Sequence, residues 1–83
     1  MSNPENVADL TRALMLRMSK TWHQLGSLNQ ATDFYLRLVR EHPDTEEAES
    51  AKLALLEIAQ GFEAEGCYRL SLGILNRLTE ATG

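Results

Sequence analysis

The residues of this 83-residue chain that could do chemistry are few, and their spacing does not favour a reaction or a metal. His23 and His42 are the only histidines, and neither has a carboxylate or a second histidine at the spacing that metal ligands on one helix require. Cys67 is the only cysteine, so an intramolecular disulfide and a zinc site built from thiolates are both excluded. We therefore expect no catalytic residue, no metal ion and no cofactor.

Charge and hydropathy exclude further classes of function. The net charge is −4, with acidic and basic residues mixed along the chain, whereas nucleic-acid-binding proteins usually carry a basic face. Apolar runs are only a few residues long, so we expect no membrane insertion. Residues 1–20 place their acids before their bases and lack the apolar region of a secretory signal. The expected location is the cytoplasm.

The elements that must position these residues are helices, because glycine and proline are rare while leucine, alanine, glutamate and arginine are frequent. The first helix is expected to start at Asn3 as cap with Pro4 following, and to end at Gly26 in a left-handed conformation. The second helix follows at once and stops before Pro43. The third begins near residue 44, with Asp44 and Glu47 as a capping box, and closes at Gly66. The fourth extends over about residues 68–78.

Each expected helix carries an apolar stripe at steps of three and four residues, which is typical of a helix that buries one face. The four stripes are Leu14, Met15, Met18, Trp22 and Leu25; Leu28, Ala31, Phe34, Tyr35, Leu38 and Val39; Ala48, Ala51, Leu55, Ile58, Ala59 and Phe62; and Tyr68, Ser71, Ile74, Leu75 and Leu78. Leu36 points away from its stripe and is expected at the surface. The short connections predict an all-α fold of two stacked antiparallel helical hairpins in a single domain, residues 1–83.

The two halves of the chain repeat each other. Gly26 and Gly66 lie 40 residues apart, and large apolar residues and small residues recur at matching offsets around them. Small residues stand at the same points in both halves: Ser19, Ala31, Ala59 and Ser71. Small residues let the helices of a hairpin approach closely, and an unrelated four-helix bundle has no reason to repeat them. Repetition at this period indicates a solenoid.

The spacing resembles the tetratricopeptide repeat (TPR), a helix-turn-helix unit with a W-x2-L-G-x2-Y pattern followed by A-x3-F and a proline. In the first unit, about residues 12–45, the pattern falls on Met15, Met18, Ser19, Trp22, Ala31, Tyr35 and Pro43. In the second, about residues 52–83, it falls on Leu55, Ile58, Ala59, Phe62, Gly66, Tyr68, Ser71 and Leu75. The offset of 40 exceeds the usual 34, so the third helix is expected to be elongated at its start. Such elongation resembles TPR domains of bacterial envelope-assembly and related scaffold proteins.

The resemblance implies that the first helix of each hairpin lines a concave face, where we expect a partner groove with an apolar floor between a basic and an acidic wall. Its candidate residues are Leu16, Arg17, Lys20, Gln24, Leu53, Leu56, Glu57 and Gln60. The alternative is an ordinary solvated face with weak ion pairs. The last helix is apolar over a wide arc and lacks a polar capping helix, so Leu70, Leu72, Gly73 and Ile74 are candidates for self-association. The alternative there is a partly exposed last helix.

The expected function is that of a non-enzymatic adaptor or scaffold, which docks a protein partner of unknown identity and forms a homodimer or higher oligomer. A purely structural homo-oligomerisation subunit is the first alternative. The second alternative is a small regulatory or catalytic helical bundle, whose only candidate functional residues would be His23, Cys67 and Glu63.

Overall fold

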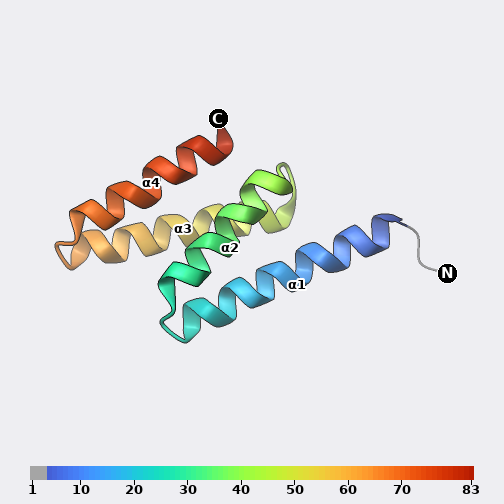
Figure 1. Cartoon of the computed structure of the whole chain (residues 1–83), viewed down its shortest axis with the longest axis horizontal. Helices are drawn as coiled ribbons and strands as arrows, with labels where there is room; N and C mark the ends of the chain where they lie inside the picture. The colour runs from blue at the N-terminus through green and yellow to red at the C-terminus, as the bar shows by residue number, and fades with distance from the viewer. Residues whose placement is uncertain (1–3) are drawn as a thin grey trace.

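The computed structural model describes residues 4–83, and side chains from residue 7 onward, as four α-helices in two antiparallel hairpins. The helices are α1 (Pro4–Gln24), α2 (Leu28–Glu41), α3 (Glu46–Ala64) and α4 (Tyr68–Thr82). Figure 1 shows α1 and α4 at opposite edges of the molecule with α2 and α3 between them. This all-α arrangement of stacked hairpins confirms the expected fold class. Asn3, the expected cap of the first helix, lies outside the described residues.

The same turn closes both hairpins. Gly26 has φ +81° and Gly66 has φ +80°, the left-handed conformation that glycine adopts without a steric penalty. In the first turn the Ser27 N–H donates to the Trp22 carbonyl at 2.9 Å, and in the second the Cys67 N–H donates to the Phe62 carbonyl at 2.8 Å. The 40-residue repeat of the sequence is therefore also a repeat of backbone geometry.

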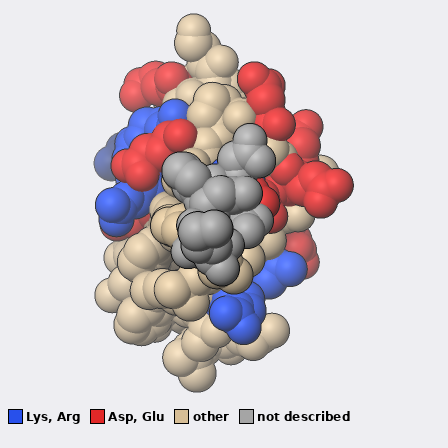
Figure 2. Space-filling model, turned by 90° about the vertical axis from the view of Figure 1, so that its right-hand side faces the viewer, with Lys and Arg blue, Asp and Glu red and all other residues tan. Residues whose placement is uncertain are grey.

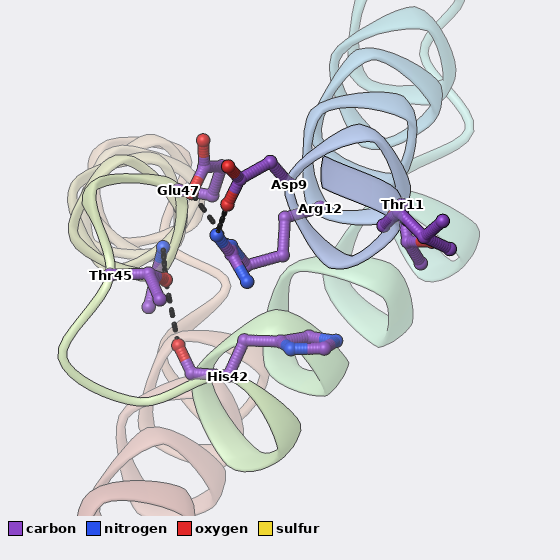
Figure 3. Close-up of polar contacts among 8 residues, drawn as sticks. Asp9, Thr11, Arg12, His42, Thr45 and Glu47 are labelled. Carbon is purple, nitrogen blue, oxygen red and sulfur yellow. Dashed lines mark hydrogen bonds and ion pairs between the residues drawn. The ribbon is translucent and has the colours of Figure 1, made fainter. Parts of the chain in front are cut away.

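The start of α3 differs from the expected capping box. Asp44 does not cap the helix, because it adopts a left-handed backbone with φ +63°. Thr45 is the cap instead, and its hydroxyl accepts from the Ala48 N–H at 3.1 Å while donating to the His42 carbonyl at 2.7 Å. Glu47 turns toward α1, where Arg12 contacts both it and Asp9 (Figure 3). An ion pair thus takes the place of the expected capping contact.

The core is centred on α2, which, like α3, contacts all three other helices. Its buried side chains include Tyr35, Leu38 and Val39, as expected, and also Leu36, which is only 1% exposed. The expectation of a surface position for Leu36 is therefore wrong, because a helix with neighbours on two sides buries two faces. The repeated small residues Ser19, Ala31, Ala59 and Ser71 are all buried, as expected of sites where helices approach closely.

The buried face of α1 also differs from the expected stripe. Met15 and Trp22 pack against the core and Ser19 is fully buried, donating its hydroxyl to the Met15 carbonyl at 2.7 Å. The other three members of the stripe are exposed, namely Leu14, Met18 and Leu25. The apolar positions of α1 therefore divide between two faces, of which only one meets α2.

The stripe of α4 is likewise only partly buried. Ser71 and Ile74 are buried and Leu78 packs against the core, whereas Tyr68 and Leu75 are exposed. Because α4 is at the edge of the array, its outer side has no neighbouring helix among the described residues.

Candidate functional site

An open groove of about 360 Å³ lies between α1 and α3, with α2 at its base. Its lining residues are Lys20, His23 and Gln24 from α1, Tyr35 from α2, and Ser50, Leu53, Ala54 and Glu57 from α3. The helical steps of three and four residues place each set on one side of its helix. The first helices of the two hairpins therefore form the walls, as the repeat pattern implied.

Four of the eight side chains expected at a concave face meet in this groove: Lys20, Gln24, Leu53 and Glu57. Leu16 is half-buried and packs against the core instead. Arg17, Leu56 and Gln60 are exposed but do not line the groove. The sequence pattern placed His23 only at the margin of this face and missed Ser50 and Ala54. The three-residue step from Lys20 to His23 was the signal that could have included the histidine.

The groove has an apolar residue between two opposite charges. Leu53 is 69% exposed, and it shares the α3 wall with Glu57. Lys20 stands on the opposite wall. No ion pair among the described residues includes Lys20 or Glu57. Both charges therefore remain free to bind a ligand that enters the groove.

A polar contact closes the base of the groove. The Tyr35 hydroxyl lies 3.2 Å from Nδ1 of His23, and the two rings meet edge to face with centroids 5.9 Å apart. Tyr35 is 1% exposed, so its hydroxyl is one of the few polar groups of the core. Burial, and then the negative charge of Glu57, raise the pKa of Tyr35 above its ordinary value of 10.0.

The raised pKa predicts how alkali acts on the fold. Because folding favours protonated Tyr35, this residue's contribution to stability is present below pH 10.0 and is lost as the pH rises through its folded-state pKa. Tyr35→Phe removes this titration along with the hydrogen bond to His23, which is worth about 0.5–1.5 kcal/mol at neutral pH. Urea unfolding followed by circular dichroism is expected to show the variant less stable at about pH 7, with the difference shrinking near about pH 11. A difference that stays constant over this range would contradict the assignment.

The remaining chemistry-bearing residues do not converge. Within residues 7–83 no group of three or more His, Cys, Asp or Glu side chains is placed to hold a metal ion. Cys67 is half-buried at the start of α4 and makes no side-chain capping hydrogen bond. His42 ends α2, where its carbonyl accepts from Thr45 (Figure 3).

Three of the four residues expected to mediate self-association line one groove, and Leu72 does not. Leu70, Gly73 and Ile74 line this second groove of about 180 Å³ between α2 and α4, next to the ion pair of Asp33 with Arg77. Ile74 is 7% exposed and belongs to the core, so it offers little side-chain surface to a second copy. Leu72 does not line that groove and is 60% exposed, two residues along the helix from Leu70. No atom lies within 4 Å of a Cβ built on Gly73, so this glycine permits no close approach within the chain.

The comparisons with known proteins add no relative: no protein-family model, curated protein or solved structure matches the chain. Over the described residues, none of the helices combines the length and the apolar character that crossing a membrane requires.

Proposed function

We propose that the chain is a non-enzymatic protein-interaction module of the TPR kind, a cytoplasmic adaptor or scaffold that binds a segment of a partner protein in the groove between α1 and α3. The observation that carries this proposal is the convergence of Lys20, Leu53 and Glu57 from two helices on one open groove. The two glycine turns, 40 residues apart with the same backbone conformation, support the resemblance to TPR proteins.

The arrangement of the groove defines the chemistry of its ligand. A peptide that fits must place an apolar side chain on Leu53, with an acidic group toward Lys20 and a basic group toward Glu57. Because the groove is open and its charges are exposed, the expected affinity is modest and falls with added salt. Gln24 and Ser50 supply side-chain amide and hydroxyl groups for hydrogen bonds to the peptide backbone.

A displayed library of random twelve-residue peptides, selected on the folded chain, tests the proposal. Enriched peptides are synthesised with a fluorophore, and their affinities are measured by fluorescence anisotropy. Lys20→Glu is expected to weaken binding at least tenfold, because it reverses the charge of the only lysine or arginine that lines the groove. Arg17→Glu is the matched control, since it makes the same charge reversal on the same helix outside the groove lining and should change the affinity less than twofold.

Circular dichroism verifies that both variants keep the helical content of the parent. Equal losses for Lys20→Glu and Arg17→Glu would show that binding depends on net charge rather than on the groove. Failure to enrich any peptide whose binding depends on Lys20 or Leu53 would contradict the proposed function.

A second candidate function, that of a structural homo-oligomerisation subunit, is favoured by the exposed apolar residues along α1.

A further inference from the structure

A second face of α1, turned away from the core, carries no charged residue from Val7 to Thr21. Together with Leu25, which lies in the turn directly after α1, this face consists of Val7, Thr11, Leu14, Met18, Thr21 and Leu25, here called the outer stripe. All six residues are exposed, Val7 by 53%, Leu14 by 50% and Leu25 by 71%. Their steps of four, three, four, three and four residues keep them on one side of a helix about 30 Å long, and none of them is charged.

Covering the outer stripe would leave no hydroxyl unpaired. Thr11 donates its hydroxyl to the Val7 carbonyl, and Thr21 donates its hydroxyl to the Arg17 carbonyl, each at 2.9 Å. Figure 3 shows Thr11 on the side of α1 that faces away from Glu47. Figure 2 shows acidic side chains gathered on the upper part of the face in view, while the lower part is mostly uncharged apart from one cluster of charged side chains. Removing this face from water therefore costs no hydrogen bond and separates no ion pair.

The internal repeat places part of the outer stripe at positions that are buried in the second hairpin. The 40-residue offset maps Met18 onto Ile58 and Thr11 onto Ala51. In α3 these counterparts are 5% and 0% exposed, because α3 packs against α2 of the preceding hairpin. In α1 the same two positions, Thr11 and Met18, are exposed, and no helix covers them among the described residues. The counterparts of Thr21 and Leu25, which are Gly61 and Glu65, are exposed as well.

The order of residues in the outer stripe reads the same in both directions. Each half of the stripe has a threonine between two apolar residues. The spacing of the two halves is symmetric about the midpoint between Leu14 and Met18. A second α1 laid antiparallel about a two-fold axis through that midpoint sets Val7 opposite Leu25, Thr11 opposite Thr21 and Leu14 opposite Met18. These steps are also those of the a and d positions of a coiled coil, which face one another in alternating a–d layers when two helices are antiparallel. One patch thus complements itself, as an isologous contact requires.

A head-to-tail contact of α1 with α4 of another copy fits less well. In α2, Leu36 and Val39 are buried. The residues 40 positions later in α4 are the polar Asn76 and Thr79, so α4 lacks the apolar residues with which α2 packs. The two ion pairs that join the hairpins, Arg12–Glu47 and Asp33–Arg77, could not be repeated either. At such a junction the position of Arg12 would be taken by Lys52 and that of Glu47 by Val7 of the next copy. The position of Asp33 would be taken by Gly73 and that of Arg77 by Arg37 of the next copy, so neither pair joins opposite charges.

We propose that two copies of this chain pair through the outer stripe of α1, antiparallel about a two-fold axis between Leu14 and Met18. The contact lies on a different side of α1 from the groove residues Lys20 and Gln24, so both functions can operate in one dimer. A single helix seam is smaller than a standard protein interface, so the dimer is expected to be weak and to dissociate on dilution. Arg17 borders the seam, and the two-fold axis brings the two copies of it toward each other.

Sedimentation velocity over a hundredfold concentration range tests the pairing. The parent chain is expected to shift from monomer to dimer, and Leu14→Glu is expected to raise the dissociation constant at least tenfold. Leu72→Glu is the matched control, because Leu72 of α4 is 60% exposed against 50% for Leu14, and it should leave the dimer intact. A parent chain that stays monomeric throughout, or a dimer that Leu14→Glu does not weaken, overturns the proposal.

Mixing the two variants identifies the arrangement. If copies stack head to tail, α1 of one copy contacts α4 of the next, so neither Leu14→Glu nor Leu72→Glu forms a dimer by itself. An equimolar mixture of the two variants would then form a dimer through their unchanged faces, and that result overturns the two-fold pairing. Cross-linking gives a readout that does not depend on the stability of Leu14→Glu. In a Cys67→Ser background, a mixture of Leu14→Cys and Met18→Cys chains is expected to form the mixed disulfide several-fold more than either homodisulfide under mild oxidation. A statistical mixture of the three products contradicts the register.

Discussion

Leu36→Ala is expected to lower the free energy of unfolding by about 2–5 kcal/mol. The residue is 1% exposed and belongs to the core cluster formed with Leu55 and Ile58 of α3. Its truncation removes contacts at the junction of the two hairpins and leaves a cavity that neighbouring helices can fill only in part. For a chain of 83 residues, such a loss is a large fraction of the total stability.

Urea unfolding followed by circular dichroism measures this loss, with Leu53→Ala as the matched control. Leu53 is 69% exposed, so the same truncation there is expected to change the free energy of unfolding by at most about 0.5 kcal/mol. Both variants lose the same atoms, so the comparison separates burial from helix propensity. Equal effects at the two positions would show that α2 does not pack between two hairpins as described.

Leu36 also shows what an apolar periodicity leaves undetermined. The pattern correctly identified the helices, the glycine turns and the small residues Ser19 and Ala59, because these depend on local conformation and on close approach within a hairpin. It assigned one buried face to each helix. The central helix α2 has neighbours on two sides and buries a second face, which no single stripe predicts.

The helix α1 presents the opposite case. Its apolar residues follow two stripes, one with Met15 and Trp22 and the other with Leu14, Met18 and Leu25. The sequence alone joined them into a single stripe, since both have steps of three and four residues. Tertiary packing determines which of the two faces contacts α2. The buried face is the one that carries the small residue Ser19, which lets the two helices approach closely.

The candidate groove could be predicted in part. The positions of Lys20, Leu53 and Glu57 followed from the resemblance, which implied that the first helices of the hairpins share a concave face. The contact of His23 with Tyr35 could not be predicted in the same way, because it joins residues of different helices across the closing turn. A side-chain contact of that kind depends on the interhelical distance, which the sequence pattern does not give.

Gly26→Ala is expected to lower the free energy of unfolding by about 1–2 kcal/mol, whereas Gly61→Ala is expected to raise it by about 0.5–1 kcal/mol. Both changes add one methyl group, and at both positions no atom lies within 4 Å of the added Cβ. Steric contact therefore cannot separate them, and the difference must come from the backbone. Gly26 has φ +81°, where an alanine is strained, while Gly61 lies within α3, where alanine is the better helix former.

Thermal and urea unfolding of the two variants measure the difference, which is expected to amount to about 1.5–3 kcal/mol between them. Gly66→Ala supplies an internal repeat of the experiment, because Gly66 closes the second hairpin with φ +80° and equally open surroundings. Its loss should match that of Gly26→Ala if the two turns are equivalent. A loss at only one of the two glycines would mean that only that hairpin depends on its left-handed turn. The two turns would then share a backbone conformation but contribute differently to the free energy of unfolding.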